Sequence, residues 1–248
     1  MIVPRAPQVI ANILGFTLTN TVLTATIVSI LIIVTAFYLS SKLDVIPSKF
    51  QNFIEVLIDS IKGIVSEQTQ GDVKRINLFF PWVATFFILI ALNNLFEILP
   101  FVGIISFYFK HAGITVPIFR TANSDLNSTI ALTLISVIVT QYLAIKQMGI
   151  LQHLKRYFNF SKPLNIFSGI FELISEFTKL ISLSFRLYGN IYAGDVIIIL
   201  FTKLGGMYFL PLPFLAFEIL IDIIQAGIFA MLTLSFMTIL TDKDELTS

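Results

Sequence analysis

The chain has 248 residues, of which 56% are hydrophobic and only 12% are charged, with a formal net charge of +1. Soluble domains carry about 25% charged residues, so this composition excludes an ordinary soluble domain and predicts an integral membrane protein. The absence of cysteine excludes disulfides and thiolate metal sites, and the near-zero net charge gives no indication of nucleic-acid binding.

The N-terminal part of the chain is predicted to contain two spans separated by an amphipathic segment. An uncharged apolar run predicts the first span at 22–39, since a bilayer requires about 20 apolar residues of helix. Apolar residues within 44–75 recur at the i, i+3, i+4 spacing of one helical face, after a capping pattern that begins at Ser48. We interpret this segment as a cytoplasmic amphipathic helix. A second run, uncharged over 76–96, predicts a span at 76–99.

Two further segments complete the middle of the chain. Pro100 is expected to end the second span, and the apolar residues 98–109 are too few to cross a bilayer, which indicates a re-entrant or interfacial loop. A third span is predicted at 126–146, with Ser124 or Asp125 as its N-cap.

The C-terminal part contains the longest uninterrupted segment, 163–204, followed by a last helix at 213–241. A single helix of about 40 residues would be about 60 Å long, which is twice the hydrocarbon thickness. It must therefore lie strongly tilted, or break near Gly189 or Gly194. We predict one all-α membrane domain over 1–248, with about five to six membrane-associated helices.

Orientation follows from the placement of lysine and arginine, which favour cytoplasmic loops. Most of these residues fall in 44–75, in 146–162 and in the C-terminal tail. These segments are therefore predicted to face the cytoplasm, with the N-terminus on the outer side.

Arg186 lies in the apolar run between Lys179 and Lys203. An arginine within the membrane costs about 2.5–3.5 kcal/mol on insertion scales, so it is a functional-site hypothesis by default. Because arginine does not lose its proton, Arg186 can act only as a fixed positive charge.

Other polar residues accompany Arg186 at helical spacing. One stripe steps by three or four residues through Glu172, Glu176, Lys179, Leu183, Arg186 and Asn190. Ser182 lies one turn before Arg186, whereas Asp195 lies half a turn round the helix and about 13 Å further along, facing away from the arginine. In the last helix, Glu218, Asp222 and Gln225 share one face and provide candidate proton carriers. The alternative is a set of structural ion pairs that hold the helices together.

The segment 182–195 (SLSFRLYGNIYAGD) resembles the most distinctive motif of subunit a of the F-type ATP synthase. Supporting stretches are 92–100 (LNNLFEILP), 122–132 (ANSDLNSTIAL) and 224–229 (IQAGIF). The resemblance covers about residues 75–240, whereas the N-terminal part agrees with the family in pattern only.

This resemblance implies a stator that lines two offset proton half-channels against a rotating ring of c subunits. Residues 163–204 and 213–241 would then form a long, strongly tilted helical hairpin. Arg186 would face the ring carboxylate, force the release of its proton and block a direct leak between the half-channels.

The resemblance also implies roles for the surrounding residues. Asn190 and Gln225 would lie beside the arginine; Asp195 and Glu218 would line the outer half-channel; Glu172 and Glu176 would serve the inner one. Many relatives carry a histidine at one of the positions equivalent to Asp195 and Glu218, whereas this chain has acids at both, joined by Asp222. Any of these three acids is a candidate for handling the ion.

The implied partners are the c-ring subunits, the peripheral-stalk b subunits, the F1 sector and the lipid bilayer, with no cofactor, metal or nucleic acid. The chain has no nucleotide loop of the G-x-x-x-x-G-K-[ST] kind, so it is not expected to be an enzyme on its own. H⁺ is favoured over Na⁺, and a bacterial plasma (inner) membrane over a mitochondrial or plastid membrane. The main alternative is a secondary transporter that binds an anionic substrate at Arg186. An intramembrane metalloenzyme is disfavoured because His111 and His153 lie in loops on opposite sides.

Overall fold

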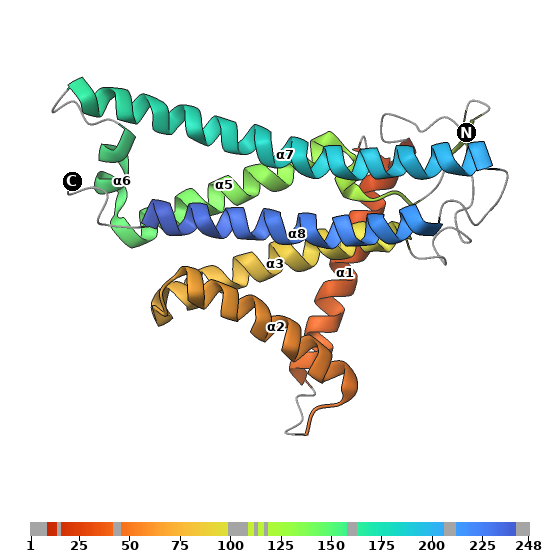
Figure 1. Cartoon of the computed structure of the whole chain (residues 1–248), viewed down its shortest axis with the longest axis horizontal. Coiled ribbons are helices and arrows are strands. Elements are labelled where there is room, and N and C mark those ends of the chain that lie inside the picture. The colour runs from red at the N-terminus through yellow and green to blue at the C-terminus, as the bar shows by residue number, and fades with distance from the viewer. Residues whose placement is uncertain are drawn as a thin grey trace.

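A computed structural model describes residues 9–13, 16–41, 46–98, 109–111, 114–116, 119–157, 163–205 and 212–241. Within these residues the chain forms seven α-helices and one 3₁₀ helix (Figure 1), which confirms the predicted all-α class. The predicted loop after Pro100 lies mostly outside the described residues.

The helices are α1 (Asn20–Ser41), α2 (Lys49–Gln68), α3 (Val73–Ile98), α5 (Leu126–Met148), α6 (Ile150–Tyr157), α7 (Pro163–Gly205) and α8 (Leu212–Thr241), with the 3₁₀ helix η1 at Ala122–Ser124. Strands β1 (Val9–Ile13) and β2 (Phe16–Thr19) pair antiparallel, as do β3 (Phe109–His111) and β4 (Ile114–Val116). Neither hairpin was predicted from the sequence, because strands this short give almost no alternating pattern.

In the part of the chain that the structure describes, four helices are long and apolar enough to cross a membrane: α1, α3 over Val73–Phe96, α5 and α8. The chain is therefore an integral membrane protein. Helix α1 covers the span predicted at 22–39, and most of its apolar side chains remain exposed, as expected for a helix whose surface meets lipid.

Helix starts follow the predicted capping chemistry. The Ser48 hydroxyl accepts a hydrogen bond from the Gln51 backbone N–H at 3.3 Å, while the Gln51 side-chain amide donates to Glu55. Of the two candidate caps for α5, Asp125 is the one that caps the helix, since its carboxylate accepts from the Asn127 N–H at 3.1 Å. These contacts satisfy backbone donors that would otherwise lack partners.

Helix α7 runs unbroken from Pro163 to Gly205, so the possibility of a break at Gly189 or Gly194 is wrong. Its 43 residues correspond to about 65 Å, far more than a hydrocarbon core of about 30 Å. Only a strong tilt lets such a helix lie within a bilayer. Figure 1 shows α7 and α8 side by side, running across the direction of α1.

Two apolar clusters hold the helices together around α3 and α8. The first includes Phe79, Leu143 and Met237 and joins α2, α3, α5 and α8. The second includes Ile90 and Leu187 and joins α3, α7 and α8. One face of the α7–α8 pair is thereby fixed against the rest of the chain, and the opposite face stays uncovered.

Candidate functional site

Arg186 lies on the uncovered face of α7. Its neighbour Phe185 is 53% exposed, whereas Leu183 and Leu187, on the adjacent face of the helix that meets the core, are 3% and 1% exposed. The guanidinium is itself exposed, and its Nη2 donates a long hydrogen bond of 3.5 Å to the Ser182 hydroxyl. Among the described residues, no carboxylate lies within ion-pairing distance of it.

The predicted polar stripe is therefore divided between environments. Leu183 packs into the core, Glu176 and Asn190 are partly buried, and Arg186 is exposed. A step of three residues leaves two side chains about 60° apart round a helix, so Leu183 can meet the core while Arg186 remains exposed.

Beyond Arg186, toward the C-terminus of α7, lies a group of charged residues that we name the Arg120 cluster: Arg120, Asp195, Glu218 and Asp222. The carboxyl groups of Glu218 and Asp222 both lie close enough to Asp195 to interact electrostatically, and Asp222 is only 3% exposed. Helix α8 approaches α7 closely here, since a Cβ added at Gly194 would lie 2.8 Å from Glu218 Oε1. Three acids from two helices thus converge on one region.

Asp195 faces Arg120 rather than Arg186. The Arg120 guanidinium acts on the Asp195 carboxyl, and no ion pair joins Asp195 to Arg186 among the described side chains. The prediction that Asp195 faces away from Arg186 agrees with this arrangement. Gln225 is 8% exposed, as expected for a residue that shares a helix face with Asp222.

Arg120 is the residue of this site that sequence reasoning missed. It lies outside every segment to which the sequence assigned a structure or a role, yet it is only 4% exposed. Its backbone N–H donates to the Thr24 hydroxyl of α1 at 3.2 Å, and its Nη2 donates to the Ser124 carbonyl at 3.5 Å. This burial comes from contacts with distant parts of the chain, for which the local sequence has no signal.

Two buried hydrogen bonds hold the residues that follow Arg120 against the end of α3. The Asn123 side-chain amide donates to Asn94 Oδ1 at 2.6 Å, and the Thr121 hydroxyl donates to the Asn93 carbonyl at 3.0 Å. The motifs at 92–100 and 122–132 thus meet in the fold and together position Arg120.

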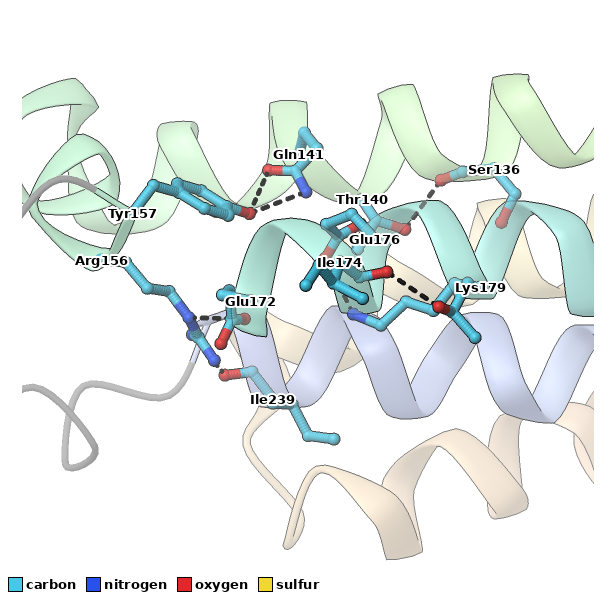
Figure 2. A network of polar contacts seen from close by, with 11 residues as sticks. Ser136, Thr140, Gln141, Arg156, Tyr157, Glu172, Ile174, Glu176, Lys179 and Ile239 are labelled. Carbon is cyan, nitrogen blue, oxygen red and sulfur yellow. Dashed lines mark hydrogen bonds and ion pairs between the residues drawn. The ribbon is translucent and has the colours of Figure 1, made fainter. Parts of the chain in front are cut away.

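The other end of the α7–α8 pair carries a second group, the α6 cluster, and Figure 2 labels all its members except His153. It comprises Gln141 of α5, His153, Arg156 and Tyr157 of α6, and Glu172, Glu176 and Lys179 of α7. Arg156 connects three helices, because its Nε pairs with Glu172 Oε1 at 2.9 Å and its Nη1 donates to the Ile239 carbonyl of α8 at 3.2 Å.

Glu172 and Glu176, the two acids expected to serve the inner half-channel, both form ion pairs here. Glu176 Oε1 pairs with Lys179 Nζ at 2.8 Å, and Lys179 also lies 4.4 Å from the centre of the Phe236 ring. The Tyr157 hydroxyl accepts from the Gln141 amide nitrogen at 3.1 Å. In the described part of the chain, no group of three or more His, Cys, Asp or Glu side chains is arranged to hold a metal ion.

Arg186 thus lies between two acid-containing clusters, about 15 Å along α7 from Glu176 and about 13 Å from Asp195. This arrangement defines a class: an α-helical membrane protein with a fixed cation between two separate groups of ionisable side chains.

Comparison with known proteins identifies the family. The family profile described as "ATP synthase A chain" matches residues 21–238. The chain therefore belongs to the ATP synthase A chain family, and the resemblance to subunit a is confirmed.

Relatives named ATP synthase subunit a include bacterial proteins similar over most of their length. The protein of Desulfotalea psychrophila is 33% identical over 210 residues, covering 85% of this chain and 79% of the relative. That of Buchnera aphidicola subsp. Baizongia pistaciae is 35% identical over 222 residues, covering 86% and 80%. That of Oceanobacillus iheyensis is 30% identical over 220 residues, covering 86% and 85%.

Proposed function

We propose that this chain is the stator subunit that conducts protons between the two sides of a bacterial plasma membrane and a rotating ring of c subunits. The exposed position of Arg186 carries the proposal, together with the family assignment. The b subunits and the F1 sector complete the complex in this proposal.

The uncovered face around Arg186 favours a protein partner over lipid. Exposed apolar residues such as Phe185 and Ile181 suit lipid, but an arginine facing hydrocarbon costs about 2.5–3.5 kcal/mol or more. A partner that presents a carboxylate at this level removes that cost. The ring carboxylate implied by the family resemblance has this chemistry.

A fixed guanidinium beside the ring carboxyl favours its ionised form, so an arriving protonated carboxyl releases its proton there. The Arg120 cluster, with Asp195, Glu218 and Asp222, would exchange protons with the outer side. The α6 cluster, with Glu172 and Glu176, would exchange them with the cytoplasm. Protons cannot pass through Arg186 itself, since its guanidinium does not deprotonate, and so the two routes stay separate.

Ser182, Asn190 and Gln225 accompany Arg186 in this proposal. Ser182 supports it through the hydrogen bond of 3.5 Å to the guanidinium, one turn away. Asn190 lies one turn beyond Arg186 and is partly buried. Gln225 would supply a neutral polar group from α8.

Reconstitution tests the proposal against the secondary transporter, which the family assignment disfavours. In liposomes, the purified chain alone is expected to give no proton flux and no uptake of anions, whereas the complete complex pumps protons on addition of ATP. Uptake of an anionic solute by the chain alone would contradict the stator function.

The contact between Gly194 and Glu218 gives a more local prediction. Gly194→Ala is expected to slow ATP-driven proton pumping severalfold, because the new Cβ displaces a carboxyl oxygen that lies 2.8 Å from its position. Gly227→Ala is the matched control on α8, since its Cβ would meet only Phe87 at 3.9 Å, an ordinary contact. Quenching of a pH-sensitive dye in inverted vesicles compares the two. Equal pumping by both variants would show that the position of Glu218 is unimportant.

A further inference from the structure

His153 of α6 is a buried ionisable residue to which neither the sequence nor the family resemblance assigned a role. Its side chain is 6% exposed, and its Nδ1 atom is buried without a hydrogen-bond partner. Buried polar atoms almost always have partners, so an unpartnered imidazole nitrogen calls for an explanation.

Ionisable groups from two helices, α6 and α7, surround His153. From its own helix, the Tyr157 ring packs edge-on at a centroid distance of 5.3 Å, and the Arg156 charge acts on the imidazole. From α7, the carboxylates of Glu172 and Glu176 act on it as well. Helix α5 contributes Gln141, which is hydrogen-bonded to Tyr157 and carries no charge.

The balance of these groups keeps the imidazole mainly neutral. Burial lowers the pKa of His153 below its ordinary value of 6.5 and Arg156 lowers it further, while Glu176 and Glu172 act in the opposite direction. At neutral pH the ring therefore has a nitrogen able to accept a proton, and it releases that proton readily to water near pH 7.

We propose that His153 exchanges protons between the acids of the α6 cluster and cytoplasmic water, completing the inner route of the proposed stator. When a proton is released to the cytoplasm, Nδ1 of His153 accepts it from a protonated Glu176 or Glu172. The imidazolium then gives one proton to water. The carboxylate is left ionised, the ring is left neutral, and one proton has moved. Nδ1 has no hydrogen-bond partner in the structure, so it can accept the hydrogen bond of a protonated carboxyl group during this step.

This inference rests on the proposed function, and chemical rescue tests it in the complete complex. ATP hydrolysis is measured in inverted vesicles with an uncoupler present, so that the rate depends on proton passage without a gradient to oppose it. His153→Ala is expected to slow this rate about 100-fold, the lower end of the range for loss of a positioned proton carrier. Added imidazole is expected to restore most of it. Pyrazole, a ring of similar size but a far weaker base, is not expected to restore the rate.

Controls separate proton exchange from structure. Tyr157→Phe keeps the ring against His153 but removes the hydroxyl that binds Gln141, so it reports the structural contribution of α6. If His153→Ala lowers the amount of chain in the membrane, His153→Gln keeps a polar side chain and replaces it in the assay. A normal rate in the variant, or equal rescue by imidazole and pyrazole, overturns the inference. The stator function is tested separately, because normal pumping by the Arg186→Ala complex would contradict it whatever His153 does.

Discussion

Replacing Arg186 with alanine is expected to abolish ATP-driven proton pumping while leaving the chain assembled in the membrane. Loss of a preorganised charge at a reacting group costs about 100-fold or more, and this guanidinium is the only charge proposed to act on the ring carboxyl. Assembly should persist because the side chain is exposed and its hydrogen bond to Ser182 is long, 3.5 Å.

A second arginine provides the contrast. Arg156 pairs with Glu172 and binds the Ile239 carbonyl, so Arg156→Ala should lower the amount of assembled chain. Dye quenching in inverted vesicles measures pumping, and immunoblotting measures assembly.

Arg186→Lys keeps the charge but loses the planar guanidinium, so its pumping rate should fall between those of Arg186→Ala and the native chain. Undiminished pumping by Arg186→Ala would end the proposed mechanism.

Replacing Arg120 with glutamine is expected to destabilise the chain by about 3–5 kcal/mol, as when one partner of a buried charge pair is removed. The guanidinium is 4% exposed and is the cation that acts on Asp195. Its loss leaves the carboxyl groups of Asp195, Glu218 and Asp222 together without a compensating charge.

A double-mutant cycle distinguishes this electrostatic role from simple packing. Adding Asp195→Asn to Arg120→Gln removes one of the uncompensated acids, so the double variant should be more stable than Arg120→Gln alone. Unfolding in detergent, followed by circular dichroism, measures each stability. If the two effects simply add, Arg120 and Asp195 are not coupled.

The sequence was most informative where periodicity and local chemistry decide the outcome. The capping of α2 by Ser48 and of α5 by Asp125 depends on neighbouring residues alone, and both contacts are present. The shared burial of Asp222 and Gln225 follows from their spacing on one helix. Arg186 was identified because a charge in an apolar run is visible without any tertiary information.

Residues whose role depends on distant contacts were not predictable in the same way. His153 was expected to lie in a loop and Arg120 had no predicted role, yet each is less than 10% exposed. Arg120 is covered through its contact with α1 and the loop joined to α3, and His153 through the packing of α6 on α7. The sequence also could not decide whether α7 is one continuous helix, because Gly189 and Gly194 permit a break without requiring one.

The central claim is that the face of α7 bearing Arg186 meets a partner ring, and cysteine cross-linking tests it most directly. The native chain has no cysteine, so single cysteines can be introduced at Ser182, which is exposed beside Arg186, and at Ser184, which is fully buried. A second cysteine is placed next to the carboxyl of the c subunit, and a disulfide forms only between Cα atoms within about 7 Å. We expect oxidation of the assembled complex to cross-link Ser182→Cys to the ring and to leave Ser184→Cys unlinked. Equal cross-linking at both positions, or none at Ser182→Cys, would contradict the claim.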